Sequence, residues 1–197
     1  MSHKANTSYA SLSTHDWSKV QRGMDRLIQG RTLADLSISK QQYWIAVPVE
    51  SAGHFDRHDI EWLVQALHKR HVQHVYAVVF EGWDVAEAIK VPSSVEGIGA
   101  INSTYSFFNV IMLAEDASWL CIATVDEYFI YFGLPDFIED AIGKNITDQY
   151  STFQNFATNP SWPGVLADEL ISVLDRCQHD YAYALRDTFI KLLKHAN

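Results

Sequence analysis

The chain has 197 residues, 48% of them hydrophobic and 13% aromatic, so it can bury a substantial core and has the usual size of one domain. Its net charge of −9 argues against a general nucleic-acid-binding protein, because contact with phosphates needs clustered lysine and arginine side chains. No apolar run approaches the roughly 18 residues that cross a bilayer, and the N-terminus lacks the hydrophobic segment of a secretory signal. We therefore expect a cytoplasmic protein that does not bind membranes.

The first third of the chain predicts a polar tail, two helices and an edge strand. Residues 1–14 are polar and small, so we expect a flexible tail followed by a single domain over residues 15–197. Apolar spacing predicts a helix over 16–29 and a second helix capped by Asp56. Aromatic and β-branched residues predict a strand over 43–49, which belongs at a sheet edge or strand end because Pro48 cannot donate to a ladder.

The middle of the chain predicts most of the sheet. Residues 74–80 are continuously apolar and predict an interior strand. We expect a short helix over 84–90 and a loop over 91–100, where two glycines and a proline occur. A meander of three strands follows, with one turn near Val125 and Asp126, and its strands are expected over residues 106–113, 119–124 and 127–132.

The last third of the chain is helical in pattern. Pro135 and Gly143 bracket a compact helix, because proline is tolerated in a first turn and glycine suits the residue after a helix. Three more helices are expected, over residues 147–157, 163–177 and 180–195, and the apolar face of the last is formed by Tyr181, Leu185, Phe189, Leu192 and Leu193. These elements predict an α+β fold with a mainly antiparallel sheet of about five strands, helices packed on it and a helical C-terminal third.

Acidic side chains are concentrated in one segment of the chain. Residues 115–148 hold eight acids against one base, Lys144. A surface of one charge sign speeds encounter with an oppositely charged partner, although an acidic excess also serves solubility. The sequence predicts that hairpin-tip acids and acids on the outer face of the next helix form a partner-binding surface, and its candidate residues are Asp126, Glu127, Asp136, Glu139 and Asp140.

The sequence predicts no catalytic residue, metal or cofactor. Five of the nine histidines fall between His54 and His74, but their spacing matches no metal motif, and His68 and His71 suit the C-terminal end of a helix. The chain has no nucleophile elbow, P-loop or dinucleotide-binding glycine motif. Its two cysteines, Cys121 and Cys177, are expected to be buried thiols, because a chain of this length does not need a disulfide to fold.

A resemblance points to a binding function. The meander W-L-x-I-A-T-x-D-x-Y-F-x-x-x-G and the helix FIEDAIG, within residues 105–143, resemble bacterial immunity proteins of contact-dependent inhibition and related polymorphic toxin systems. The resemblance implies a cytosolic, non-catalytic protein that blocks a cognate toxin, often a basic nuclease, with an acidic surface. Only four positions of this chain match the family pattern, and we expect them to have structural roles: Trp119, Asp126, Tyr128 and Gly133.

Two other functions stay open from the residues alone. A small cytosolic hydrolase would use the histidines between His54 and His74 together with nearby acids. A self-associating adaptor would pair through an exposed strand near Pro48. The sequence leaves the oligomeric state and the identity of the toxin open.

Overall fold

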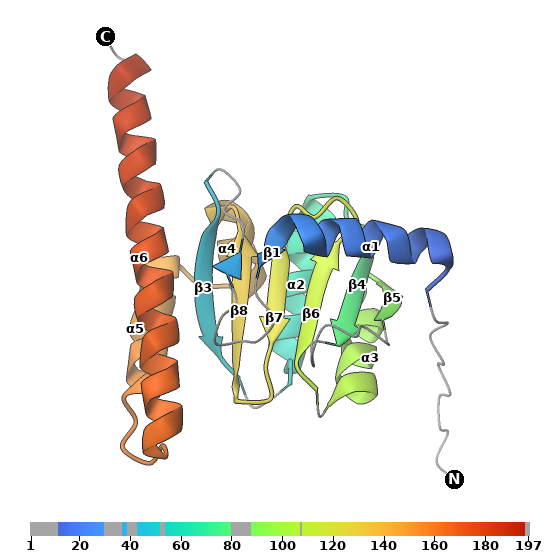
Figure 1. The fold of residues 1–197 in the computed structure, drawn as a ribbon, viewed down its shortest axis with the longest axis horizontal. Coiled ribbons are helices and arrows are strands. Elements are labelled where there is room, and N and C mark those ends of the chain that lie inside the picture. Colours follow the sequence, from blue (N-terminus) through green and yellow to red (C-terminus); the bar gives the residue numbers. More distant parts are fainter. Residues whose placement is uncertain are drawn as a thin grey trace.

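The computed structural model describes residues 12–29, 37–38, 43–51, 54–79, 88–106 and 108–195. Within these ranges, side chains are described for all residues except 29, 37–38, 180 and 183–195. Of the tail expected over residues 1–14, residues 1–11 lie outside the described residues, whereas Ser13 caps a helix that begins at Thr14. Most of the helix expected over 84–90 also lies outside the described residues. The fold is α+β, with helices packed around an antiparallel sheet, as the sequence predicts (Figure 1).

The central sheet has six strands in the order β3-β8-β7-β6-β4-β5, and every neighbouring pair is antiparallel. The predicted meander is confirmed as β6, β7 and β8, which are adjacent in both chain and sheet. The strands are β3 (Ile45–Glu50), β4 (His74–Val79), β5 (Ala88–Pro92), β6 (Val110–Ala114), β7 (Leu120–Ala123) and β8 (Tyr128–Gly133). A separate pair is formed by β1 (Ile28–Gln29) and β2 (Ser37–Ile38).

Helices cover both faces and one edge of the sheet (Figure 1). One face carries α2, α3 and α4, the other face is crossed by α1, and α5 and α6 stand beside the β3 edge. The helices are α1 (Thr14–Leu27), α2 (Arg57–Lys69), α3 (Val95–Tyr105), α4 (Pro135–Ile142), α5 (Ile146–Ala157) and α6 (Gly164–His195). None of the helices in the described part of the chain is both long enough and apolar enough to cross a membrane.

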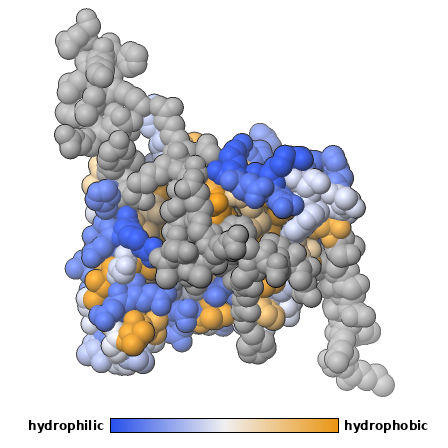
Figure 2. Space-filling model, in the orientation of Figure 1, coloured by the Kyte–Doolittle hydropathy of each residue, from blue (hydrophilic) through white to orange (hydrophobic). Residues whose placement is uncertain are grey.

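Each face of the sheet has its own hydrophobic core. The larger core joins α2, α3 and α4 to the sheet, with Leu63, Ile98 and Ile138 fully buried in it. The smaller core lies under α1, where Val20, Met24 and Leu27 pack on strands β4, β6 and β7. The outer surface of α1 is hydrophilic (Figure 2), so α1 is an amphipathic helix whose apolar face packs on the sheet.

The prediction of about five strands was one too few, because β5 was not recognised. Residues 88–92 pair with β4 in register, from Ala88 opposite Val78 to Pro92 opposite His74. The sequence predicts the end of a short helix and the start of a loop at these residues. Lys90 and Pro92 interrupt the apolar run, and the burial of the five residues does not alternate, so cross-strand pairing decided the conformation of β5.

The loop expected over residues 91–100 was also wrong, because α3 begins at Val95. The Ser94 side chain caps this helix by accepting a hydrogen bond from the backbone N–H of Gly97 at 3.1 Å. A side chain at residue 97 would place its Cβ 2.1 Å from the carbonyl oxygen of Pro92. Gly97 therefore serves close packing of helix on strand rather than a loop.

The two helices expected over 163–177 and 180–195 form one continuous helix, α6, of 32 residues. No glycine or proline occurs between residues 165 and 195, so nothing in that sequence interrupts the backbone ladder. Two predicted helix ends agree with the structure. Asp56 caps the start of α2 in a capping box with Asp59, and Gly143 ends α4 in the left-handed conformation. At the N-terminus, α1 begins at Thr14, two residues before the predicted start.

Strand β3 is an edge strand, as Pro48 predicted, but helix α5 protects its outer edge. Gln149 donates from Nε2 to the Pro48 carbonyl at 3.1 Å, and Tyr150 donates its hydroxyl to the Ala46 carbonyl at 2.5 Å. These two side chains satisfy carbonyls that would otherwise offer a template for another strand. The edge near Pro48 is therefore covered, which removes the support for an adaptor that self-associates there.

Candidate functional site

The five predicted binding residues do not form one surface. Asp126 and Glu127 lie in the turn between β7 and β8, whereas Asp136, Glu139 and Asp140 lie on α4, which follows the far end of β8. A strand of six residues spans about 20 Å at roughly 3.3 Å per residue. The hairpin tip and the start of α4 are therefore at opposite ends of the sheet (Figure 1).

The acids of α4 are engaged within the protein. Arg70, just after α2, donates to Asp136 at 2.9 Å and to Asp140 at 3.1 Å, and Lys69 donates to Asp140 at 2.6 Å. The hydrogen bond from Lys69 is the main cause that lowers the pKa of Asp140. The Arg70 guanidinium also lies 5.0 Å from the centre of the Phe137 ring. These ion pairs connect α4 to the end of α2, so Asp136 and Asp140 have a structural role within the protein.

Glu139, the third acid on α4, accepts a hydrogen bond from the backbone N–H of Ile146 at 3.3 Å. Ile146 is the first residue of α5, whose leading N–H groups have no partner within the helix. Glu139 therefore links the end of α4 to the start of α5, a role that needs no external partner.

The hairpin tip is held by a small hydrogen-bond network. The Thr124 hydroxyl donates to the Tyr128 carbonyl at 2.8 Å and accepts from the Asp126 N–H at 3.2 Å. The Asn109 side chain accepts from the Val125 N–H at 3.0 Å. Glu127 has a φ of 65°, a left-handed conformation that a non-glycine residue adopts only where its surroundings impose it. The carboxylates are thus presented on an ordered turn.

Glu169 on α6 joins the acids of the tip. The buried hydroxyl of Tyr128 donates to Glu169 at 2.9 Å. Burial, and then the negative charge of Glu169, raises the pKa of Asp126. Glu50, at the end of β3, lies opposite Tyr128 in the sheet register, and Ser51 donates its N–H to the Glu127 carbonyl at 2.8 Å. We call Glu50, Asp126, Glu127 and Glu169 the hairpin-end acids.

None of the hairpin-end acids forms an ion pair within the described part of the chain. Within those residues, no lysine, arginine or histidine nitrogen lies within ion-pairing distance of any of the four. Arg176, further along α6, donates to the Ser172 carbonyl at 3.3 Å, and its charge reaches the Tyr128 hydroxyl without an ion pair to Glu169. The sequence analysis did not identify Glu50 and Glu169 as part of this group. Glu50 lies 76 residues before Asp126, and Glu169 lies 42 residues after Glu127. Pairing of β3 with β8 brings Glu50 to the hairpin tip, and the hydrogen bond from Tyr128 brings Glu169 there.

The histidines between His54 and His74 are split between the two ends of α2. His54 and His58 lie at its start, whereas His68, His71 and His74 lie at or after its end. Thirteen helical residues at about 1.5 Å each separate the two groups by roughly 20 Å. His68 lies 2.7 Å from the Ser93 carbonyl through Nε2. Across the described ranges, no three histidine, cysteine, aspartate or glutamate side chains are placed to hold a metal ion.

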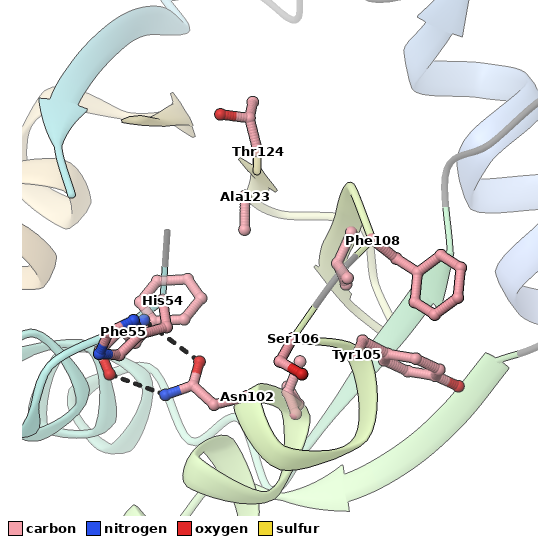
Figure 3. Close-up of a pocket in the computed structure, with 10 residues that line it drawn as sticks. His54, Phe55, Asn102, Tyr105, Ser106, Phe108, Ala123 and Thr124 are labelled. Atoms are coloured by element: carbon pink, nitrogen blue, oxygen red, sulfur yellow. Dashed lines mark hydrogen bonds between the residues drawn. The ribbon is translucent and has the colours of Figure 1, made fainter. Parts of the chain in front are cut away.

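A shallow hollow lies beside the hairpin, lined by His54, Phe55, Asn102, Tyr105 and Thr124 among others (Figure 3). It contains about 300 Å³ of space, part of which is open solvent. The Asn102 side-chain oxygen accepts a hydrogen bond from the Phe55 N–H at 3.2 Å, and the Asn102 side-chain NH₂ donates to the Phe55 carbonyl at 2.7 Å. Because the Asn102 and Thr124 polar groups bind backbone atoms, the hollow is better explained as packing than as a substrate site.

The remaining candidates from the sequence are part of the core. Cys121 and Cys177 are buried free thiols, as predicted, and burial raises the pKa of Cys121. A raised pKa keeps the thiol protonated and poorly nucleophilic. Trp119 is fully buried, and only 1% of the surface of Tyr128 is exposed. The Trp119 ring stacks on the Phe137 ring.

The chain was compared with models of protein families, with curated proteins and with solved structures, and none of them matches significantly.

Proposed function

We propose that this chain is a non-catalytic, cytoplasmic immunity protein that neutralises a protein toxin, and that the hairpin-end acids bind lysine and arginine side chains around the toxin's active site. A toxin that cleaves nucleic acid must present such cations to bind phosphate. An inhibitor with an acidic surface would cover them and exclude the substrate.

The observation that carries this proposal is the proximity of Asp126 and Glu169, neither of which has an ion-pair partner among the described residues. Burial raises the pKa of Asp126, and the nearby negative charge of Glu169 raises it further, so the ionised form of Asp126 is disfavoured in the free protein. The arrangement costs the free protein some stability and would be relieved by a cationic partner. The ordered turn supports the same function, because a surface that is already fixed loses little entropy on binding.

The proposal narrows the surface expected from the sequence. Asp126 and Glu127 remain in it, together with Glu50 and Glu169. Asp136 and Asp140 are excluded because Arg70 and Lys69 already pair with them. The separation of the histidines leaves a hydrolase without a common site in the described residues.

The test uses the variable C-terminal domain of the protein encoded immediately upstream of this chain. The purified domain should bind this protein tightly, and the affinity should fall as salt is added, because screening weakens charge pairing. Co-expression should protect cells from the toxic domain. An upstream frame that encodes a metabolic enzyme, or a toxic domain that does not bind, would refute the proposal.

The matched variants locate the surface. Asp126→Lys combined with Glu169→Lys should weaken binding roughly 30-fold or more, because lost contacts between buried charges cost about 2–5 kcal/mol. Glu96→Lys, an exposed change in the first turn of α3 just after the edge strand β5, is the control and should bind normally. Equal affinity of both variants, with unchanged folding, would place the interface elsewhere.

A further inference from the structure

Helix α6 has two parts with different surroundings. Its first half packs on β3 and α5 through the buried residues Leu170, Val173, Leu174 and Cys177. Its second half extends beyond the end of the sheet toward the C-terminus (Figure 1). At about 1.5 Å per residue, the fifteen residues from 181 to 195 reach some 22 Å. A helix of that length is marginal in water unless it packs against something.

A second stripe runs along α6 beside the one that packs on the sheet. Its first five positions, Asp168, Ile171, Asp175, Gln178 and Ala182, are spaced alternately by three and four residues, and all five are exposed. Ile171 is 40% exposed, which is unusual for isoleucine. The described surface around the start of α6 mixes hydrophilic and hydrophobic side chains (Figure 2).

The same spacing continues through the extended half of the helix. The next positions are Leu185, Phe189 and Leu192, so the stripe becomes apolar in sequence where α6 leaves the sheet. Alternating steps of three and four residues define the contact seam of a two-stranded coiled coil. We call the eight positions from Asp168 to Leu192 the α6 seam.

Charge divides α6 into complementary halves. Residues 164–180 contain four acids and one base, a net charge of −3, whereas residues 181–195 contain one acid and three bases, a net charge of +2. Two parallel copies of α6 would place like charges together. Two antiparallel copies would place the basic half of each against the acidic half of the other, which is favourable.

We propose that α6 pairs with α6 of a second copy of this chain as an antiparallel, two-fold symmetric coiled coil. With the symmetry axis near residue 180, Ile171 lies opposite Phe189 of the second copy, and Gln178 lies opposite its Ala182. Asp175 then lies opposite Leu185 and beside Arg186 of the second copy, and Asp168 lies opposite its Leu192 and beside its Lys191. The body of each copy occupies the space beside the extended half of the other.

The dimer goes beyond the proposed toxin binding and uses a different surface. Glu169 faces Tyr128 of its own sheet, whereas the seam follows Asp168 and Ile171 on another side of the helix. Loss of dimerisation and loss of toxin binding can therefore be measured separately.

The first test measures the mass of the full chain in solution by sedimentation velocity and light scattering at micromolar concentrations. The native protein should be a dimer. Leu185→Glu and Phe189→Glu should each weaken dimerisation at least roughly tenfold, because the first places a second acid opposite Asp175 and the second replaces the apolar contact with Ile171 by a charge. Ile190→Glu introduces the same charge outside the seam and should leave a dimer. A monomeric native protein, or equal effects of all three variants, would overturn the proposal.

The second test determines orientation. A mixture of Ile171→Cys and Phe189→Cys proteins should form a mixed disulfide on mild oxidation, whereas Phe189→Cys alone should not, because the two residues 189 lie at opposite ends of an antiparallel pair. Efficient linking of Phe189→Cys to itself would show a parallel dimer and overturn the arrangement. The buried Cys121 and Cys177 do not compete for oxidation.

The third test swaps charges. Asp175→Lys should weaken the dimer and Asp175→Lys with Arg186→Glu should restore it, because each copy then again offers opposite charges across the interface. Failure of the double variant to recover, although folded, would contradict the register. Vesicles containing anionic lipid provide the remaining arm. A monomeric protein that binds these vesicles through α6 would show that the apolar stripe serves a lipid surface and would refute self-association.

Discussion

Tyr150 on α5 donates its hydroxyl to the carbonyl oxygen of Ala46 on β3 at 2.5 Å, and this contact joins the C-terminal helices to the sheet edge. Both residues are buried, and the Tyr150 oxygen also lies 3.0 Å from the Cys177 carbonyl. Removing the hydroxyl leaves a buried carbonyl without this donor, and an unsatisfied buried group costs about 1–3 kcal/mol.

We expect Tyr150→Phe to lower the free energy of unfolding by about 1–2 kcal/mol in urea denaturation. Tyr181→Phe is the matched control, because its ring lies 5.5 Å from the Tyr150 ring and is preserved by the change. It should alter stability by less than about 0.5 kcal/mol. Equal losses in both variants would mean that the β3 edge does not depend on the Tyr150 hydroxyl.

Two glycines in α3 should respond to alanine in opposite directions. Gly97→Ala places a Cβ 2.1 Å from the Pro92 carbonyl oxygen, so helix and strand must separate, and overpacking of this kind costs about 1–3 kcal/mol. At Gly99 the nearest atom is Ile60 Cδ1 at 3.8 Å, an ordinary contact. Gly99→Ala should stabilise the helix by about 0.5–1 kcal/mol. Thermal unfolding of both variants checks the difference, and a neutral Gly97→Ala would contradict the close packing of β5 and α3.

Acid should weaken the link between α4 and α2. The pKa of Asp140 is lowered from 3.8 by the Lys69 hydrogen bond and by Arg70, so below 3.8 the unfolded chain binds more protons at this residue. The stabilising contribution is therefore complete above about pH 5 and is lost as the pH falls through the folded pKa. Unfolding free energy measured from pH 6 to 2.5 should fall less steeply for Asp140→Asn than for the native protein. Identical slopes would show that Asp140 does not contribute.

Neutralising an acid should have opposite effects at the two ends of β8. Asp126→Asn removes repulsion with Glu169, so at pH 7 stability should rise by up to about 0.5 kcal/mol. Asp136→Asn removes the ion pair with Arg70, so stability should fall by a similar amount, about 0.5 kcal/mol. Because the pKa of Asp126 is raised, its ionised form is the less favoured one in the folded state, and the gain should shrink as the pH is lowered through that pKa. A loss of stability in Asp126→Asn would show that Asp126 supports the fold instead of remaining available for a partner.

The sequence predicted those elements whose local signals agree with their environment. Asp56 and Gly143 mark helix ends through capping and a left-handed residue, and both signals act within a few residues of the chain. Pro48 predicted an edge strand because the missing N–H excludes an interior position. The same logic failed for residues 91–100, where Gly97 serves packing against Pro92 rather than a loop.

The grouping of charges depended on the tertiary structure. Along the chain, Asp126 and Asp140 belong to one acidic segment, but β8 carries them to opposite ends of the sheet, and Lys69 and Arg70 arrive from 70 residues away to neutralise Asp140. Glu169, remote in sequence, comes to Asp126 because Tyr128 binds it from the sheet. Composition and periodicity therefore determined the α+β class, most helices and the acidic character of the second half. Only the pairing of strands and the docking of helices decided which acids are neutralised internally and which stay available, because charge interactions depend on distance in space rather than along the chain.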